Sequence, residues 1–253
     1  MANALEGTVA LVTGASSGIG EATARGLAAH GAAVAVVARR KDRLDALVSE
    51  LESDGGRALA LEADITERDQ AVAAVERTAE ELGRLDILVN NAGVMLLGPA
   101  ADAPIEEWER MVALNVTGLL YAAHAALPHL TRAAQDDPRR VADLVNVSSV
   151  AGRRATAGSG VYNATKHAVN AFSEALRQEV TTQHVRVAVI EPGAVVTELT
   201  DHLRPEIREQ LRSGFDFERL RAEEIADAIA YVVTRARHVA INELLIRPTE
   251  QVR

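Results

Sequence analysis

A tyrosine and a lysine stand four residues apart in the stretch "SGVYNATKHA", at Tyr162 and Lys166. Lysine is scarce in this chain, because 25 of the 27 basic residues are arginine and only Lys41 and Lys166 are lysine. Residues four apart on a helix share a face, so the two side chains point the same way if residues 161–180 are helical. A phenol has a pKa of about 10, and a nearby ammonium lowers it by favouring the phenolate. Such a pair is suited to exchange a proton with a substrate.

Two serines in the stretch "NVSSVAG" stand at the end of the fifth expected strand, residues 143–149. Parallel sheets bind ligands at the carboxyl ends of their strands, which is where these serines are expected. A hydroxyl there can donate a hydrogen bond to a carbonyl oxygen and stabilise the negative charge that develops during reduction. Each pattern also has a structural explanation, since Tyr-x-x-x-Lys arises by chance in helices and serines cap turns.

A glycine-rich loop, "TGASSGIG", directly follows the first expected strand and precedes a helix. Glycine allows the backbone to approach a ligand closely, and a helix start offers free N–H groups to a phosphate. The spacing is not G-x-G-x-x-G, so a tight strand-to-helix turn is the alternative explanation. The position after the first strand favours a dinucleotide site. We expect it to include Gly14, Ser16, Ser17, Gly18, Ile19 and Gly20.

The end of the second expected strand indicates which dinucleotide binds. An acidic residue there, about 20 residues beyond the glycine loop, would bind the ribose hydroxyls of NAD. Here Ala38 is followed by "RRKDR", the densest basic run in the chain. Guanidinium binds phosphate through two parallel hydrogen bonds, so we expect NADP(H), with Arg39 as the main clamp on its 2′-phosphate and Arg40 as a secondary one. A solvated run of charges is the alternative.

Short apolar runs alternate with longer segments of helical period. The runs are apolar at consecutive positions, as in parallel strands covered on both faces. We expect strands at 8–14, 32–39, 58–64, 85–93, 143–149, 185–193 and 243–249. This alternation predicts an α/β fold, a Rossmann-like doubly wound seven-stranded parallel sheet with helices on both faces, in a single domain over residues 1–253. Residues 132–140, "RAAQDDPRR", are expected to form a surface loop, and about 194–222 a substrate lobe.

Composition narrows the classes of partner. The formal charge of −9 disfavours nucleic acid and anionic membrane as partners, because both need a positive surface. The absence of cysteine excludes disulfides and thiolate metal sites and is typical of a cytoplasmic protein. No signal peptide is recognisable, and no apolar run approaches the roughly 18 residues that span a bilayer. The seven histidines lack metal-ligand spacing, so we expect no catalytic metal.

Taken together, "TGASSGIG", "NNAG", "NVSS" and "YNATK" resemble the motifs of the short-chain dehydrogenase/reductase family, in its short, single-domain branch. The resemblance covers nearly the whole chain, and the motifs have the family's order and spacing. It implies a catalytic tetrad of Asn115, Ser149, Tyr162 and Lys166. In the family the tyrosine exchanges the proton, the lysine tunes it and binds ribose, the serine polarises the carbonyl, and the asparagine holds a relay water.

The resemblance also assigns cofactor contacts along the chain. It places Asn91, Ala92 and Gly93 under the adenosine, Asp64 and Ile65 beside the adenine, and Pro192, Gly193, Val195 and Thr197 along the nicotinamide amide. Tyr162 and Lys166 would contact the cofactor too. One NADP-binding subtype carries a basic residue where Ser17 stands here, so the NADP prediction depends on Arg39. Family members are usually dimers or tetramers, which implies a homo-oligomer, with a homotetramer expected.

The motifs favour an NADPH-dependent reductase of small aldehydes or ketones, which would also run in reverse as an alcohol dehydrogenase. Within the family, "NNAGVMLLGP" and "IRPTEQVR" resemble bacterial NADPH-dependent reductases. A β-ketoacyl carrier-protein reductase would share the tetrad, but the glycine-rich ending common among them is absent. An NAD-linked hydroxy-acid or polyol dehydrogenase fits Ala38 and Arg39 less well. A non-catalytic NADP-binding regulator would not require four reacting groups.

Overall fold

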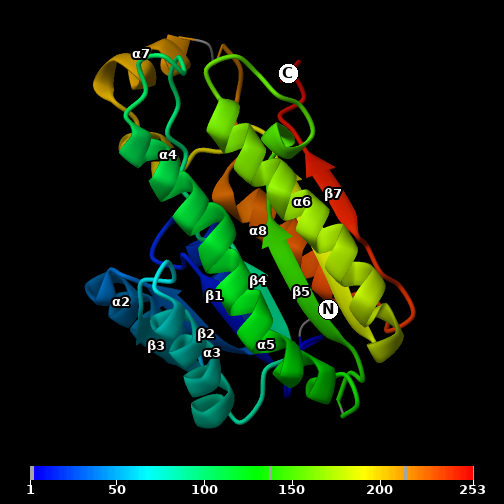
Figure 1. Ribbon diagram of the computed structural model, residues 1–253. Coiled ribbons are helices and arrows are strands. Elements are labelled where there is room, and N and C mark those ends of the chain that lie inside the picture. Colours follow the sequence, from blue (N-terminus) through cyan, green and yellow to red (C-terminus); the bar gives the residue numbers. More distant parts are fainter. Residues whose placement is uncertain (1–2, 137, 214–215, 253) are drawn as a thin grey trace.

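Seven parallel strands form one central sheet, in the order β3-β2-β1-β4-β5-β6-β7 (Figure 1). The computed structural model describes residues 3–136, 138–213 and 216–252. The strands are β1 (Val9–Thr13), β2 (Ala33–Ala38), β3 (Ala58–Glu62), β4 (Ile87–Asn90), β5 (Ala142–Val147), β6 (Val185–Pro192) and β7 (Glu243–Ile246). The predicted Rossmann-like sheet is therefore confirmed. The order reverses between β1 and β4, and crevices for ligands form at such a reversal.

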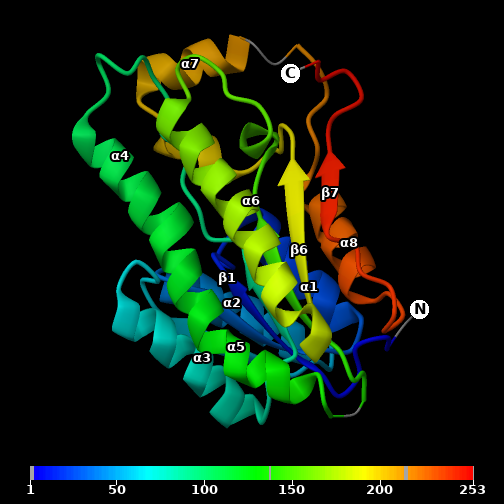
Figure 2. The ribbon, with the colours of Figure 1, turned by 45° about the vertical axis from the view of Figure 1, so that its right-hand side comes forward.

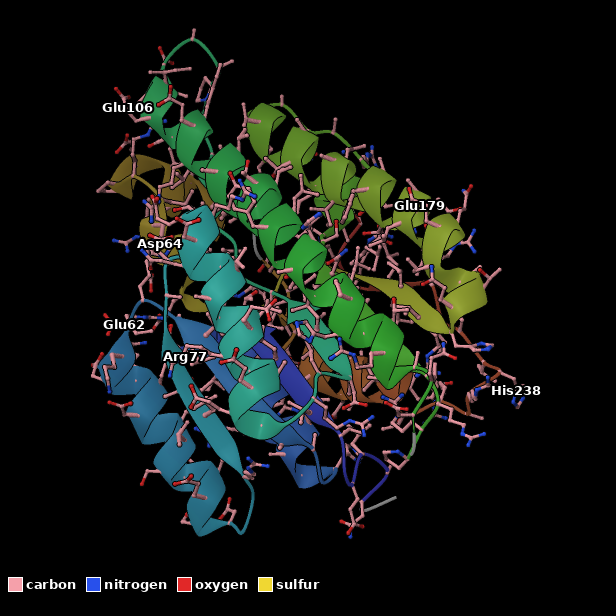
Figure 3. All side chains as sticks on the ribbon, turned by 60° about the horizontal axis from the view of Figure 1, so that its bottom comes forward. Glu62, Asp64, Arg77, Glu106, Glu179 and His238 are labelled. Carbon is pink, nitrogen blue, oxygen red and sulfur yellow. The ribbon has the colours of Figure 1, made fainter. Side chains whose placement is uncertain are left out.

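Helices cover both faces of the sheet (Figures 1 and 2). One core cluster joins the sheet to α3 (Arg68–Leu82), α5 (Leu119–Ala133) and α6 (Gly160–Val180), and the other joins it to α1 (Gly18–Ala29), α2 (Lys41–Ser53) and α8 (Ala222–Val233). Successive strand residues point to opposite faces, so Leu11 belongs to the first cluster and Val12 to the second. This two-sided burial explains why the strands are apolar at consecutive positions. Charged side chains such as Arg77 and Glu179 lie on the outer faces of the helices (Figure 3).

A π-helical turn interrupts one long helix. α4 (Ile105–Val112) continues through the π-helical η1 (Ala113–Gly118) into α5. By length and composition alone, Ile105–Ala133 is long and apolar enough to cross a membrane, which qualifies the expectation of no spanning segment. However, α5 buries Ala122, Ala126 and Leu130 in the core between the sheet and its neighbouring helices. Turns of π-helix occur frequently at functional sites.

The carboxyl ends of the strands are covered by a lobe that contains η4 (Glu198–His202) and α7 (Pro205–Ser213), seen at the top of Figures 1 and 2. Its base is closed where Val196 N donates to the carbonyl of Leu220 at 2.8 Å and Leu220 N donates to that of Ala194 at 3.0 Å. Two short 3-10 turns, η2 (Val150–Gly152) and η3 (Thr181–Gln183), follow β5 and α6. The lobe predicted for about 194–222 lies here, apart from residues 214–215, which fall outside the described residues.

The segment 132–140 differs in part from the surface loop expected of it. Its first two residues complete α5, and residue 137 lies outside the described part. The side chain of Arg139 is only 9% exposed, and its Nη2 lies 2.8 Å from the carboxylate of Asp143. Arg186 Nε also donates to Asp143, at 2.7 Å. A buried carboxylate requires charged partners, so Arg139 turns inward and the prediction of a surface loop is wrong for this residue.

Candidate active site

A cavity of about 550 Å³ lies under the lobe, at the carboxyl ends of the strands. Its walls include every residue predicted to bind the cofactor except Gly20, together with three of the four predicted catalytic residues. Asn115 is the fourth and lies behind the wall, 2% exposed. The structure therefore brings residues from β2, β5, β6, α1 and α6, and from the loops that follow β1, β3 and β4, to one site.

The glycine loop is shaped by close approaches of the backbone. Gly14 and Gly18 have φ angles of +67° and +57°, which favour glycine. A Cβ on Gly14 would lie 2.7 Å from the Cα of Ala92, and a Cβ on Gly20 would collide with the carbonyl oxygen of Gly14. Larger residues would fill this cradle at the start of α1, where free N–H groups can bind phosphate. The loop fits the diphosphate of a dinucleotide.

Arg40, rather than Arg39, lies against the glycine loop. Arg40 Nη2 donates to Ser16 Oγ at 2.9 Å and to Ser17 Oγ at 2.8 Å. The side chain of Arg39 is 62% exposed, with its Nη1 3.7 Å from a carboxylate oxygen of Asp64. Both arginines line the cavity, but Arg40 is held in place by several partners.

Hydrogen bonds fix the adenosine side of the cavity. Asn91 Nδ2 donates to the carbonyl oxygen of Thr13 at 3.0 Å, which joins the loop after β4 to the end of β1. Asp64 follows β3 at the edge of the cavity (Figure 3). Its Oδ1 accepts hydrogen bonds from the backbone N and the hydroxyl of Thr66, at 3.0 and 2.7 Å. One carboxylate oxygen is thereby fully used, and the other faces Arg39.

The segment after β6 closes the opposite wall. Gly193 N donates to the carbonyl of Ile246 at 2.7 Å, and Ala194 N donates to Gln251 Oε1 at 2.8 Å. A Cβ on Gly193 would collide with the Gln251 side chain. Thr197 packs on the glycine loop, because a Cβ on Gly18 would lie 3.1 Å from its Cγ2. The C-terminal tail therefore helps to position the segment predicted to line the nicotinamide.

The side chains of Tyr162 and Ser149 lie side by side in the cavity, within reach of a hydrogen bond. Tyr162 stands in the first turn of α6 and is 7% exposed, whereas Ser149 is extended after β5 and leads into η2. Ser149 Oγ also lies 3.1 Å from the backbone N of Ala151 and 3.5 Å from the carbonyl oxygen of Pro192. Ser148, by contrast, points to the carbonyl of Lys166 at 3.3 Å. Ser149, the serine that the family resemblance implies, is the one beside the tyrosine.

Lys166 lies one helical turn from Tyr162, with its Nζ 5.8 Å from the centroid of the phenol ring. Nζ donates a hydrogen bond to the carbonyl oxygen of Val147 at 2.9 Å. Burial lowers the pKa of Lys166 to about 8. Burial also raises the pKa of Tyr162 to about 12, although the hydrogen bond with Ser149 opposes this. The direction differs from the sequence expectation, because burial is the largest influence on the pKa of this phenol.

Asn115 sits in the π-helical turn and binds the loop that carries Gly93. Its Oδ1 accepts from Val94 N at 2.8 Å, and its Nδ2 donates to the carbonyl of Val94 at 2.9 Å and to Thr165 Oγ1 at 3.2 Å. A Cβ on Gly93 would lie 3.3 Å from Asn115 Oδ1 and 3.8 Å from Lys166 Nζ. Asn115 is therefore close to the lysine but is engaged by the protein itself.

Asn163 was missed by the sequence analysis, although it stands beside Tyr162. It is 3% exposed, and its Nδ2 donates to the carbonyls of Ala151 and Arg154 at 2.9 and 3.0 Å. Its Oδ1 accepts from Thr156 N at 3.1 Å. These bonds hold the loop after Ser149 against the start of α6. An amide beside the tyrosine was the signal in the sequence, but its partners are set by the fold.

No cluster of histidine and acidic residues suited to a metal ion occurs within residues 3–136, 138–213 and 216–252.

The model of the short chain dehydrogenase family matches residues 8–208, most of the chain. The protein belongs to the short-chain dehydrogenases.

A relative and solved structures that are similar to this chain support its place among the short-chain dehydrogenases. An uncharacterised oxidoreductase of Staphylococcus saprophyticus is 35% identical over 98% of this chain and 99% of its own. The structure of a serine dehydrogenase complexed with NADP+ superposes with a TM-score of 0.86 at 34% identity, over 97% of each chain. The structure of a 3-ketoacyl-(acyl-carrier-protein) reductase of Brucella melitensis, complexed with NADH, superposes with a TM-score of 0.84 at 32% identity. The match covers 96% of this chain and 97% of the reductase. The chain is thus an NAD(P)-dependent oxidoreductase of the family, whose members act on small molecules.

Proposed function

We propose that the protein is an NADPH-dependent carbonyl reductase that reduces a small aldehyde or ketone and oxidises the alcohol in the reverse direction. The observation that carries this proposal is the placement of Ser149 and Tyr162 side by side, with Lys166 near the phenol, in the same cavity as the glycine loop. A hydroxyl pair of this kind can receive a carbonyl oxygen, and a phenol can supply its proton.

Ser149 and Tyr162 have different roles at the carbonyl oxygen. Ser149 donates a hydrogen bond and stabilises the negative charge that grows there, and Tyr162 gives up its phenolic proton. The raised pKa keeps Tyr162 protonated at neutral pH, which suits a proton donor. NADPH supplies the hydride when bound.

Lys166 and Asn115 support the phenol. The Lys166 ammonium lies close enough to favour the phenolate that remains after proton transfer. We propose that Lys166 also binds the cofactor ribose and that Asn115 holds the loop of Gly93, with the relay of protons to solvent as its further role. The bonds of Asn115 to Val94 support the positioning part of this role.

The preference for NADPH is supported by Arg40 and by the two serines that hold it. Arg40 stands after β2, where the sequence predicts the 2′-phosphate, and its guanidinium contacts the hydroxyls of Ser16 and Ser17 at the glycine loop. We therefore assign the main clamp to Arg40 and a secondary contact to Arg39. NADP complexes occur among similar structures, and an NADH complex occurs as well.

Two further proposals concern the location and the assembly of the whole protein. The chain carries a formal charge of −9 and no cysteine, which favours a cytoplasmic enzyme without nucleic-acid or membrane partners. Tyr121 and Leu127 on α5 and Phe172 on α6 are only partly buried against the core. This supports a homo-oligomer, a dimer or tetramer, formed through these helices.

A screen for NADPH consumption tests the proposal. Purified protein is mixed with NADPH and small aldehydes, ketones, acyl thioesters or sugars, and the absorbance of NADPH is followed. Oxidation with aldehydes or ketones is expected. Preference for acyl thioesters would favour a β-ketoacyl carrier-protein reductase, and NADPH binding without any turnover would favour a regulator.

A further inference from the structure

Arginine side chains line the cavity beyond those that the sequence assigns to the cofactor. Arg154, Arg219 and Arg247 all line it. Among the described residues of its wall, the carboxylates are Asp64 and Glu198, and both stand at the adenosine side with arginine partners. The described wall therefore carries more arginines than carboxylates, in a protein whose formal charge is −9.

Each of these arginines belongs to a segment tied to the reaction site. Arg154 lies in the loop that Asn163 holds against the turn of Tyr162. Arg247 follows Ile246, whose carbonyl accepts from Gly193 N. Arg219 precedes Leu220, whose backbone is bonded to Ala194 and Val196. Arg154 and Arg247 are exposed, so they stand at the mouth of the cavity.

We propose that the substrate carries a carboxylate: a keto acid or an aldehyde acid, held at the mouth by Arg154 and Arg247. This rests on the proposed function and names its substrate class. A guanidinium matches a carboxylate through two parallel hydrogen bonds, and a cationic cleft raises the local concentration of anions. Met95 and Leu97 line the same cavity and suit the apolar chain between the two groups.

The reaction on such a substrate changes only the carbonyl. Its carbon accepts the hydride of NADPH and its oxygen accepts the proton of Tyr162, so the C=O double bond becomes a C–OH single bond. The substrate gains two electrons, NADPH becomes NADP+, and the carboxylate is unchanged. The product is a hydroxy acid.

Matched pairs of substrates test this inference. Oxo acids and their methyl esters are compared through kcat/KM, in the wild type and in the Arg154→Gln and Arg247→Gln variants. The acids are expected to be better substrates by at least about tenfold, and each variant is expected to raise the KM for the acids about three- to thirtyfold, with the esters unaffected. Arg132→Gln, at the far end of α5, removes the same charge and is expected to leave the KM for the acids and for the esters unchanged.

The outcomes distinguish a substrate without a carboxylate from a protein that is not a reductase. Equal kcat/KM for acids and esters, or turnover of esters alone, would overturn the carboxylate and leave the reductase intact. An equal rise in KM for acids and esters in the variants would also overturn it. Absence of NADPH oxidation with every acid and ester would contradict both this inference and the proposed function.

A second inference rests on an independent contact at the adenosine side. Glu198, the first residue of η4, accepts hydrogen bonds from Arg40 Nη1 at 2.8 Å and from Arg43 Nη1 at 2.7 Å. These bonds from Arg43 and Arg40 lower the pKa of Glu198 to about 2, so the carboxylate stays charged. The lobe is thereby joined to Arg40, the arginine assigned as the main clamp on the cofactor phosphate.

The geometry points to Glu198 as an internal competitor of the NADPH 2′-phosphate, because both anions need the same guanidinium. Displacement of Glu198 would release the lobe from Arg40 when NADPH binds, whereas NADH carries no 2′-phosphate to displace it. Glu198 would then weaken NADPH binding selectively. This also rests on the proposed function, which names NADPH as the cofactor.

Titrations with NADPH and NADH test this second inference in the wild type and in Glu198→Gln. The dissociation constant for NADPH is expected to fall about two- to tenfold, with that for NADH unchanged. Glu206→Gln, also in the lobe but without contact to Arg40, is expected to change neither. Weaker NADPH binding in Glu198→Gln, or an equal change for both cofactors, would overturn the inference. Failure of the wild type to bind NADPH would contradict the proposed function instead.

Discussion

The side chains of Ser149 and Tyr162 lie side by side, although they come from different elements, the end of β5 and the start of α6. This placement lets one carbonyl oxygen meet both hydroxyl groups. Lys166, with its Nζ 5.8 Å from the phenol ring, completes the group. The chemistry of the site can therefore be tested one residue at a time.

Substitution of Ser149 by alanine should slow carbonyl reduction. Loss of one hydrogen bond to the developing negative charge is expected to lower kcat about 10²- to 10³-fold. The dissociation constant for NADPH should remain the same. Ser148→Ala is the matched control, because that hydroxyl points to a backbone carbonyl. A larger loss in Ser148→Ala than in Ser149→Ala would contradict the assignment.

The pH dependence of reduction should follow Lys166. Burial lowers its pKa to about 8, so the ammonium is present below pH 8 and is lost above it. Tyr162, with a pKa of about 12, stays protonated throughout this range. With NADPH as the varied substrate, kcat/KM reports the free enzyme and should be level below pH 8 and decline above. A profile that stays level to pH 10 would disagree with this role of the ammonium.

Cofactor preference should depend more on Arg40 than on Arg39. Arg40→Gln removes the guanidinium that contacts Ser16 and Ser17, and the KM for NADPH is expected to rise about tenfold. The KM for NADH should change little. Arg39→Gln, the matched control, should have a smaller effect because its side chain is mostly exposed. A larger rise in the KM for NADPH in Arg39→Gln than in Arg40→Gln would favour Arg39 as the main clamp, as the sequence predicted.

Asn163 should affect the substrate loop and the stability of the fold. Asn163→Ala leaves two carbonyls and one N–H without their partner, which is expected to reduce the free energy of unfolding by about 1–3 kcal/mol. Chemical denaturation measures this loss. The KM for the carbonyl substrate should rise while NADPH binding is retained. An unchanged midpoint of denaturation would show that these bonds contribute little.

The strands, the glycine loop and the positions of Ser149 and Tyr162 could be predicted because each depends on local pattern. Apolar runs follow from burial on both faces of the sheet, and Gly14 and Gly20 follow from close backbone approach. The family resemblance, through its motif spacing, chose Ser149 over Ser148. These features need no knowledge of distant partners.

The remaining features depend on contacts between distant parts of the chain. Arg40 turns to the glycine loop and to Glu198, a residue far along the sequence, so its rank relative to Arg39 was not predictable. Arg139 turns inward because of the buried carboxylate of Asp143. The raised pKa of Tyr162 follows from how deeply it is buried, which spacing does not reveal.

The most direct measurement is NADPH oxidation by Tyr162→Phe with a carbonyl substrate that the wild type accepts. This substitution removes one hydroxyl and keeps the ring, and NADPH titration verifies that the cofactor still binds. A fall in kcat to near background is what a phenolic proton donor predicts. Turnover at the wild-type rate would mean that the proton comes from elsewhere and that Tyr162 has another role.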